Sequence, residues 1–401
     1  MDTWFAEQQT RLRDLSEIKR YLYPGIDWSS RCIGIQGARG VGKTTMMLQY
    51  LVQEYSGSDK GLYVSVDHPK FQAKSLFEFG QDFFSYGGKT LFLDEVHKYE
   101  GWAKHIKALY DSCPGLQIIF SGSSILQIND QDADLSRRAV VYSLPGLSFR
   151  EFLFFECKES FPAISLEDLL HDHVRYSQEV NLRVRPLEHF LNYLRYGYYP
   201  FFMEGRDVYP LKLARVINQV LENDLPLARY VDSRQVGKLK KLLFFLAQNV
   251  PSEVNMQKLS SQTGISRPKV YEYIESLQRA RLLNLIRGGE RGYKILSKPD
   301  KIYLENPNLA YALCDDVNPG TLRESFFANQ IVNTFGSFPA GPISTASQGD
   351  FFVKQKFVFE IGGKSKGKKQ IKDLENGFVA ADGIETGMGR KIPLWLFGFL
   401  Y

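Results

Sequence analysis

A phosphate-binding loop is the sequence feature that most constrains this chain. Residues 37–44 read Gly-Ala-Arg-Gly-Val-Gly-Lys-Thr and fit the pattern G-x4-GK-[ST] in full, between the apolar run Cys32–Gln36 and the helical run Thr45–Tyr50. Glycines in such a loop turn backbone N–H groups toward a β-phosphate, the lysine reaches the β- and γ-phosphates, and the threonine binds Mg²⁺. We therefore expect ATP to be bound by Gly37, Arg39, Gly40, Val41, Gly42, Lys43, Thr44 and Thr45.

Two carboxylates after a second apolar strand provide the other half of such a site. The run Leu91–Leu93 ends in Asp94 and Glu95, and the carboxyl ends of parallel strands are where ligands of these sheets bind. We expect Asp94, with Thr44, to hold Mg²⁺ and Glu95 to polarise the attacking water as general base. An N-capping pair on the next helix is the alternative interpretation.

Two further groups are candidates for reading the γ-phosphate. Ser121 follows the apolar strand 116–120, which should place its hydroxyl beside the carboxylate strand, although a plain turn would also explain this serine. Arg138, or its neighbour Arg137, precedes the strand 140–144 and is a candidate arginine finger, in cis or across an oligomer interface. A surface arginine pair is the alternative for these two residues.

The order of apolar runs predicts an α/β fold for the first third of the chain. Strands alternate there with helical stretches, as in a parallel sheet covered by helices. A helix-rich stretch from Phe149 to about Asp232 follows, and we expect breaks at its prolines. The strands are expected at residues 32–36, 62–66, 91–93, 116–120 and 140–144, and the breaks at Pro186, Pro200, Pro210 and Pro226.

The segment between Ser233 and Lys301 is basic, with 14 Lys and Arg against five Asp and Glu, which is a net charge of +9. The whole chain has a net charge of +5, so the rest of the chain is slightly acidic. Its three helical stretches include a helix, a turn at Gly264 and a second helix from Arg267, which is the layout of a winged helix. Arg267, Lys269 and Tyr273 would then face DNA. The expected wing contains Gly288, Gly289 and Gly292 with Arg287, Arg291 and Lys294. A winged helix that only packs inside a larger ATPase, or another three-helix arrangement, is the alternative.

Carboxylates in the last hundred residues suggest a second metal site. Asp350 and Glu360 flank a strand in the manner of a PD-(D/E)xK nuclease, and Glu324 on the preceding helix is an additional acid. The motif is broken, because Gly362 and Gly363 displace Lys364 from its usual place two residues after the glutamate. We expect either a Mg²⁺ site or an acid–lysine salt-bridge cluster, and we favour a nuclease-like fold without cleavage activity.

Five segments of the chain resemble one known family in order and spacing: Gly37–Thr45, Leu93–Lys98, Phe120–Ser124, Leu147–Phe152 and Leu194–Pro200. They look like prokaryotic AAA+-type ATPases that carry a fused C-terminal restriction-endonuclease-like domain. The resemblance spans essentially the whole chain and implies ATP binding and hydrolysis. One departure is Arg137, where many relatives have a glycine before the arginine that matches Arg138, so the finger assignment is weakened.

Together these features predict four parts: a P-loop AAA+-type domain in residues 1–150, a helical lid or connecting region in 151–232, a winged helix in 233–304 and an α/β nuclease-like domain in 305–401. The longest uncharged apolar run, Ile392–Tyr401, is too short to span a membrane, and the first residues carry no secretory signal. We therefore expect a cytoplasmic protein. The cysteines Cys32, Cys113, Cys157 and Cys314 show no spacing for a structural zinc site.

The predicted function is that of a Mg²⁺-dependent ATPase whose winged-helix and nuclease-like domains act on or near DNA. Expected partners are ATP, double-stranded DNA and further copies of the chain, and no membrane. A nucleotide-dependent switch that binds a protein, without nucleic acid, is one alternative. An ATP-licensed, metal-dependent nuclease is another.

Overall fold

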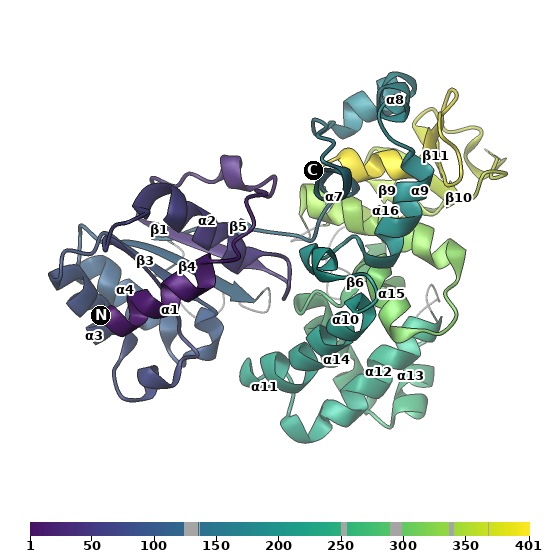
Figure 1. The fold of residues 1–401 in the computed structure, drawn as a ribbon. Coiled ribbons are helices and arrows are strands. Elements are labelled where there is room, and N and C mark those ends of the chain that lie inside the picture. The colour runs from purple at the N-terminus through teal and green to yellow at the C-terminus, as the bar shows by residue number, and fades with distance from the viewer. Residues whose placement is uncertain (124–134, 136, 250–254, 289–298, 337–340, 368) are drawn as a thin grey trace. The chain divides into compact units, whose positions relative to one another are not determined.

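The computed structural model describes the chain except residues 124–134, 136, 250–254, 289–298, 337–340 and 368 (Figure 1). The chain divides into two compact units, Met1–Pro145 and Gly146–Tyr401. The division lies five residues before the predicted boundary at residue 150. Among the described residues, no helix is long and apolar enough to cross a membrane.

The first unit is built on a five-stranded parallel sheet with strand order β2-β3-β4-β1-β5. Its strands are β1 Cys32–Gly37, β2 Gly61–Ser65, β3 Thr90–Asp94, β4 Gln117–Ser123 and β5 Val140–Ser143. All five expected strands are therefore confirmed to within a few residues. β4 lies between the loop strand β1 and the carboxylate strand β3, which places the carboxyl ends of the three strands side by side.

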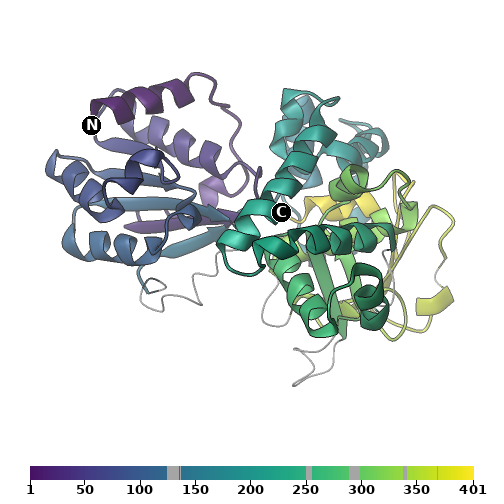
Figure 2. The same cartoon turned by 90° about the horizontal axis from the view of Figure 1, so that it is seen from below.

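Helices cover both faces of this sheet (Figure 2). They are α1 Asp2–Leu12, α2 Lys43–Tyr55, α3 Leu76–Ser85 and α4 Trp102–Ser112. β1 to β4 are almost entirely buried, as their continuous apolar sequences predict for a sheet covered on two sides. α3 begins at a capping box, in which Ser75 accepts from the Glu78 amide and the Glu78 side chain accepts from the Ser75 amide.

The second unit begins with helices whose starts are set by proline. Pro186, Pro210 and Pro226 lie in the first turns of α9, α10 and α11, and Pro200 opens a 3-10 turn, because proline needs no intrahelical N–H partner there. Three of the expected breaks, at Pro186, Pro200 and Pro210, are thus starts of helical segments. Pro226 lies in a helical stretch that continues from α10 through the π-helical turn Val220–Asp224. The helices are α7 Phe149–Cys157, α8 Leu166–Asn181, α9 Pro186–Tyr196, α10 Tyr209–Gln219 and α11 Leu225–Leu227.

Five further α-helices and a seven-stranded mixed sheet complete the described part of this unit. The helices of the predicted winged helix are α12 Val236–Asn249, α13 Met256–Thr263 and α14 Arg267–Arg279, followed by α15 Pro307–Leu313 and α16 Pro319–Phe335. The sheet has the order β12-β11-β10-β9-β8-β6-β7. Its strands are β6 Leu283–Gly288, β7 Lys301–Leu304, β8 Ile343–Thr345, β9 Phe351–Val353, β10 Phe357–Gly362, β11 Gly377–Ala381 and β12 Lys391–Pro393.

The strands of the predicted wing belong to this larger sheet. β6 pairs antiparallel with β7 and parallel with β8, so the hairpin after α14 continues directly into the C-terminal strands. The boundary predicted at residue 304 therefore falls inside one sheet. The boundary predicted at residue 232 stays a prediction.

Candidate nucleotide-binding site

The phosphate loop joins β1 to α2 and depends on glycine geometry at three positions. Gly40 and Gly42 have φ of 84° and 98°, in the left-handed region that other residues avoid. A Cβ on Gly37 would lie 2.3 Å from the Leu144 carbonyl oxygen, so only glycine fits where the loop leaves β1. The Lys43 ammonium lies over this loop and donates to the Gly37 and Ala38 carbonyls, at 2.9 Å each.

Asp94 is the centre of the hydrogen-bond network beside this loop. The Thr44 hydroxyl donates to its Oδ2 at 2.7 Å, and the Tyr63 hydroxyl donates to the same oxygen at 2.6 Å. Oδ1 accepts from the Ser121 hydroxyl and, at 3.1 Å, from the Glu95 amide. The carboxylate is only 4% exposed, and these donors fix its orientation toward α2.

The oxygen atoms of Thr44 and Asp94 fit a magnesium ion. Mg²⁺ prefers hydroxyl, carboxylate and water oxygens and is usually held by one or two protein groups together with substrate phosphates. Among the described residues no cluster of three or more His, Cys, Asp or Glu side chains is arranged to hold a metal without such help. The donor set therefore suits a metal that arrives with a nucleotide.

Glu95 is held in an unusual backbone conformation between two cations. Its φ of 55° turns the chain sharply after β3, and its carboxylate forms ion pairs with Lys98 and, at 3.8 Å, with Arg39. Burial raises the pKa of Glu95, but the Lys98 hydrogen bond and the charges of Arg39 and Lys98 outweigh burial and leave the pKa below its usual value. Lys98 also pairs with Asp67 at 2.7 Å.

The family model described as an AAA domain matches residues 29–153, which contain the phosphate loop and both carboxylates. This segment is an AAA domain. AAA domains are nucleotide-binding ATPase modules, and the parallel sheet of the first unit has the α/β architecture expected of one. A second model, described as a domain of unknown function, matches residues 187–319.

The curated relatives have no assigned function. An uncharacterized protein of Methanocaldococcus jannaschii is 26% identical over 390 residues, which cover 89% of this chain and 81% of that protein. An uncharacterized protein of Haemophilus influenzae is 28% identical over 264 residues, which cover 61% of this chain and 60% of that protein.

Solved structures of replication initiators show a weak likeness. The replication initiator DnaA bound to AMPPCP and single-stranded DNA has a TM-score of 0.30 at 16% identity, covering 69% of this chain and 88% of that chain. AMPPCP-bound DnaA from Aquifex aeolicus has a TM-score of 0.28 at 13% identity, covering 64% of this chain and 84% of that chain.

Ser121 lies where the sequence predicts, but it does not point to an open site. β4 pairs with β3, and the Ser121 hydroxyl is fully buried and donates to Asp94. This residue therefore orients the carboxylate of the AAA domain. The predicted contact of Ser121 with the γ-phosphate stays a prediction, and in this arrangement its hydroxyl donates to Asp94.

Arg138 lies at the amino ends of the parallel strands, whereas the phosphate loop lies at their carboxyl ends. It precedes β5, whose first residue Val140 is level with Ile33 at the start of β1, whereas the loop follows the end of β1. Its guanidinium forms an ion pair with Asp111 at 2.9 Å. This position does not favour a finger in cis, and the arginine finger, in cis or across an oligomer interface, stays a prediction.

Two residues that support the AAA domain's site were missed from the sequence. Tyr63 lies in the apolar run of β2, yet its hydroxyl donates to Asp94 on the neighbouring strand. Burial, followed by the charge of Asp94, raises the pKa of Tyr63. Arg20 is 4% exposed and donates to the Val41 carbonyl at 2.5 Å and the Pro145 carbonyl at 2.9 Å. A tyrosine beside the carboxylate strand was a readable signal, whereas nothing in the sequence around Arg20 indicates its partners.

The predicted DNA-facing residues of α14 do not share one face. Arg267 and Lys269 are exposed, and Lys269 pairs with Glu272. Tyr273 is only 4% exposed and packs with the apolar face of the helix, so its predicted DNA contact is wrong. Arg287 forms an ion pair with Glu275, and the wing residues Arg291 and Lys294 lie outside the described residues.

The C-terminal carboxylates come together with lysines. Glu360 is 1% exposed and pairs with Lys366, while Asp350 Oδ2 accepts from the Ile361 amide at 2.7 Å. Lys301 lies 3.7 Å from Glu324 and 4.0 Å from Asp350. The arrangement is the predicted salt-bridge cluster, and the described residues provide no metal cluster there.

The lysine that pairs with Glu360 is Lys366 and not Lys364. β10 ends at Gly362, and the chain turns back so that the Lys366 side chain crosses Gly362, where a Cβ would lie 2.6 Å from it. Burial lowers the pKa of Lys366. The hydrogen bond to Glu360 and the charges of nearby carboxylates raise this pKa by more than burial lowers it, so the net shift is upward. Gly362 therefore leaves room for this lysine to reach Glu360.

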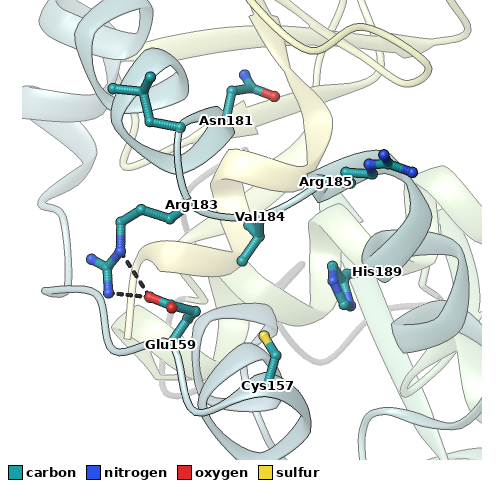
Figure 3. A pocket seen from close by; sticks show the side chains of 8 residues that line it. Cys157, Glu159, Asn181, Arg183, Val184, Arg185 and His189 are labelled. Carbon is teal, nitrogen blue, oxygen red and sulfur yellow. Dashed lines mark hydrogen bonds and ion pairs between the residues drawn. The ribbon is translucent and has the colours of Figure 1, made fainter.

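A surface pocket of about 390 Å³ lies in the second unit, between the ends of α7 and α8 and the start of α9 (Figure 3). Glu159 at its rim accepts from Arg183, which neutralises one of the two arginines that line it. Burial raises the pKa of the Cys157 thiol, so it is a poor nucleophile. The pocket therefore carries no catalytic constellation.

Proposed function

We propose that this chain binds ATP with Mg²⁺ at the phosphate loop of its AAA domain and hydrolyses it. The observation that carries the proposal is the 2.7 Å hydrogen bond between the Thr44 hydroxyl and Asp94 Oδ2. It joins the first residues of α2 to the end of β3, so a phosphate-binding loop and a metal-binding carboxylate meet at one point.

Each residue then has a distinct task in hydrolysis. Lys43 neutralises charge on the β- and γ-phosphates, and Thr44 and Asp94 hold the metal, which would supply positive charge to the transferring phosphoryl group. Glu95 accepts the proton of the attacking water. Tyr63 and Ser121 keep the Asp94 carboxylate aimed at the loop.

The proposal is tested by comparing ATP binding and turnover in three variants. Glu95→Gln should retain ATP affinity and lose turnover by about 10²-fold or more, because only the proton acceptor is removed. Lys43→Ala should weaken binding itself. Glu54→Gln, an exposed acid on α2, is the matched control and should behave as the parent. Parent-like turnover in Glu95→Gln would contradict the assignment.

We further propose that the second unit acts on or near double-stranded DNA. The exposed Arg267 and Lys269 at the first turn of α14 support this, together with the net charge of +9 in their segment. A homo-oligomer would let Arg138 of one copy approach the nucleotide of another. The alternative is a nucleotide-driven switch for a protein partner, favoured by ATP binding without any salt-dependent DNA binding.

For the C-terminal sheet we propose a nuclease-like fold that does not cut. Glu360 and the Asp350–Glu324 pair already have cationic partners in Lys366 and Lys301, which compete with a metal. The parent should leave supercoiled DNA intact with Mg²⁺ or Mn²⁺. Metal-dependent nicking that is abolished in both Asp350→Ala and Glu360→Ala would instead establish an ATP-licensed nuclease.

A further inference from the structure

His97 carries a buried ring nitrogen without a hydrogen-bond partner. Its Nε2 has almost no exposed surface, and the described part of the chain offers it neither a donor nor an acceptor. A buried polar atom left unpaired costs free energy, so such atoms are rare unless a ligand pairs with them. His97 lies two residues after Glu95, in the 3-10 turn Val96–Lys98.

The hydrogen bond at the other ring nitrogen determines what Nε2 can do. The Ser123 amide donates to Nδ1 at 3.4 Å, so Nδ1 is the acceptor and the neutral ring carries its proton on Nε2. Burial, followed by the charges of Lys43, Lys98 and Arg39, lowers the pKa of His97 to about 4 against the opposing effect of Glu95. The ring is therefore neutral at pH 7, and Nε2 is a donor that needs an acceptor.

The surroundings of this donor select an anion. The positive charges of Lys43, Lys98 and Arg39 act on the ring against the negative charge of Glu95, and a negatively charged acceptor suits this surplus of cations. Two of these four groups, Lys43 and Glu95, are the residues placed on either side of the γ-phosphate in the proposed hydrolysis. The Ser123 amide that donates to His97 lies at the end of β4, level with Gly37 where the phosphate loop begins, so the ring lies at the same ends of the strands as the loop.

We propose that His97 Nε2–H donates to a γ-phosphate oxygen of bound ATP and so distinguishes ATP from ADP. The inference rests on the proposed nucleotide site and adds the residue that reads the terminal phosphate. It also replaces Ser121 in that role, since the Ser121 hydroxyl is committed to Asp94.

The test compares the affinity of ADP with that of AMPPCP, a non-hydrolysable ATP analogue, by calorimetry with Mg²⁺. His97→Ala should weaken AMPPCP by about tenfold or more, the usual effect of losing a hydrogen bond to a charged group, and should change ADP by less than about twofold. His97→Gln, whose amide can donate from a similar position, should recover part of the loss. His105→Ala is the matched control, because its Nδ1 also accepts a backbone amide, from Phe77, and it should bind both nucleotides as the parent does.

Nitrogen-15 spectra of the parent give a readout that needs no variant. The Nε2–H signal of His97 should move when AMPPCP is added and stay in place with ADP. An equal loss of ADP and AMPPCP affinity in His97→Ala, or unchanged discrimination, would overturn the role of His97 while leaving the nucleotide site intact. A parent that binds neither nucleotide would overturn the site and this inference together.

Discussion

Asp94 and Glu95 are adjacent in sequence but lie in opposite environments. Asp94 is enclosed by hydroxyl and amide donors, which fix one orientation of its carboxylate. Glu95 is paired instead with the side chains of two cations, Lys98 and Arg39. A positively charged side chain can move away from Glu95 without any change in the backbone. Of the two carboxylates, only Glu95 can therefore change its basicity when a nucleotide or a partner binds.

This difference leads to a pH prediction for Lys98→Met. Lys98 lowers the pKa of Glu95, so removing it should raise that pKa and make Glu95 a stronger base. The acid limb of the ATPase pH profile, where Glu95 becomes protonated and inactive, should therefore move to higher pH. The measurement is kcat/KM for ATP between pH 4.5 and 9.

Lys104→Met is the control, because Lys104 is an exposed lysine on α4. It should leave the acid limb where the parent has it. An acid limb that stays in place in Lys98→Met as well would show that another group sets it.

At the scale of elements, β10 shows how a glycine determines which lysine reaches a buried acid. Gly362 leaves room for the Lys366 side chain to cross the end of the strand, and Glu360 on the same strand is nearly inaccessible to water. Among the described residues, Lys366 is the cation that pairs with Glu360, and a buried carboxylate that loses such a partner is costly in a sheet interior.

Lys366→Met should therefore lower the free energy of unfolding by roughly 2 kcal/mol, less than the 3–5 kcal/mol of a fully buried pair because Lys366 is 35% exposed. Urea unfolding of the full chain, followed by tryptophan fluorescence, measures this change. Lys364→Met removes an equal charge from an exposed side chain two residues earlier and should cost less than about 0.5 kcal/mol. Equal losses in both variants would show that overall charge, and not the Glu360 pair, is responsible.

The sequence predicted the positions of helices and strands better than it predicted which side chains are buried or paired. Continuous apolar runs mark buried parallel strands, so the five strands of the first unit were readable, and the loop motif located the nucleotide site. Tyr273 was misplaced because a tyrosine in a basic helix suits either a core or a surface, and only the packing of α12 to α14 decides between them. Lys366 was missed because a turn, and not strand periodicity, brings it to Glu360.

At the scale of the whole molecule, the chain joins an AAA domain to a larger unit with a concentrated positive charge. Charge contacts to DNA phosphates release counterions, so the affinity of such a unit falls with salt, with a log–log slope of about −0.9 per neutralised phosphate. Several basic residues of the segment already have acidic partners, among them Lys240, Lys269 and Arg287. The number of phosphates contacted should therefore be well below the number of basic residues.

Replacing Arg267 and Lys269 together by Ala should weaken binding to duplex DNA and make the salt slope shallower by about 1 to 2. Fluorescence anisotropy with a labelled duplex at 50 to 300 mM salt gives both quantities. Lys60→Ala with Lys89→Ala removes the same charge from exposed sites in the first unit and should leave the slope unchanged. Identical slopes in the two double variants would assign the effect to net charge alone.

The continuous sheet of the second unit limits where genes for such chains can recombine. A crossover at residue 304 would separate β6 and β7 from β8 and leave two unpaired strand edges, which invite pairing with other chains. A crossover near Pro145 would cut no sheet in either unit. Exchange of the AAA domain between such proteins should therefore be tolerated, whereas exchange of the last hundred residues alone should yield insoluble protein.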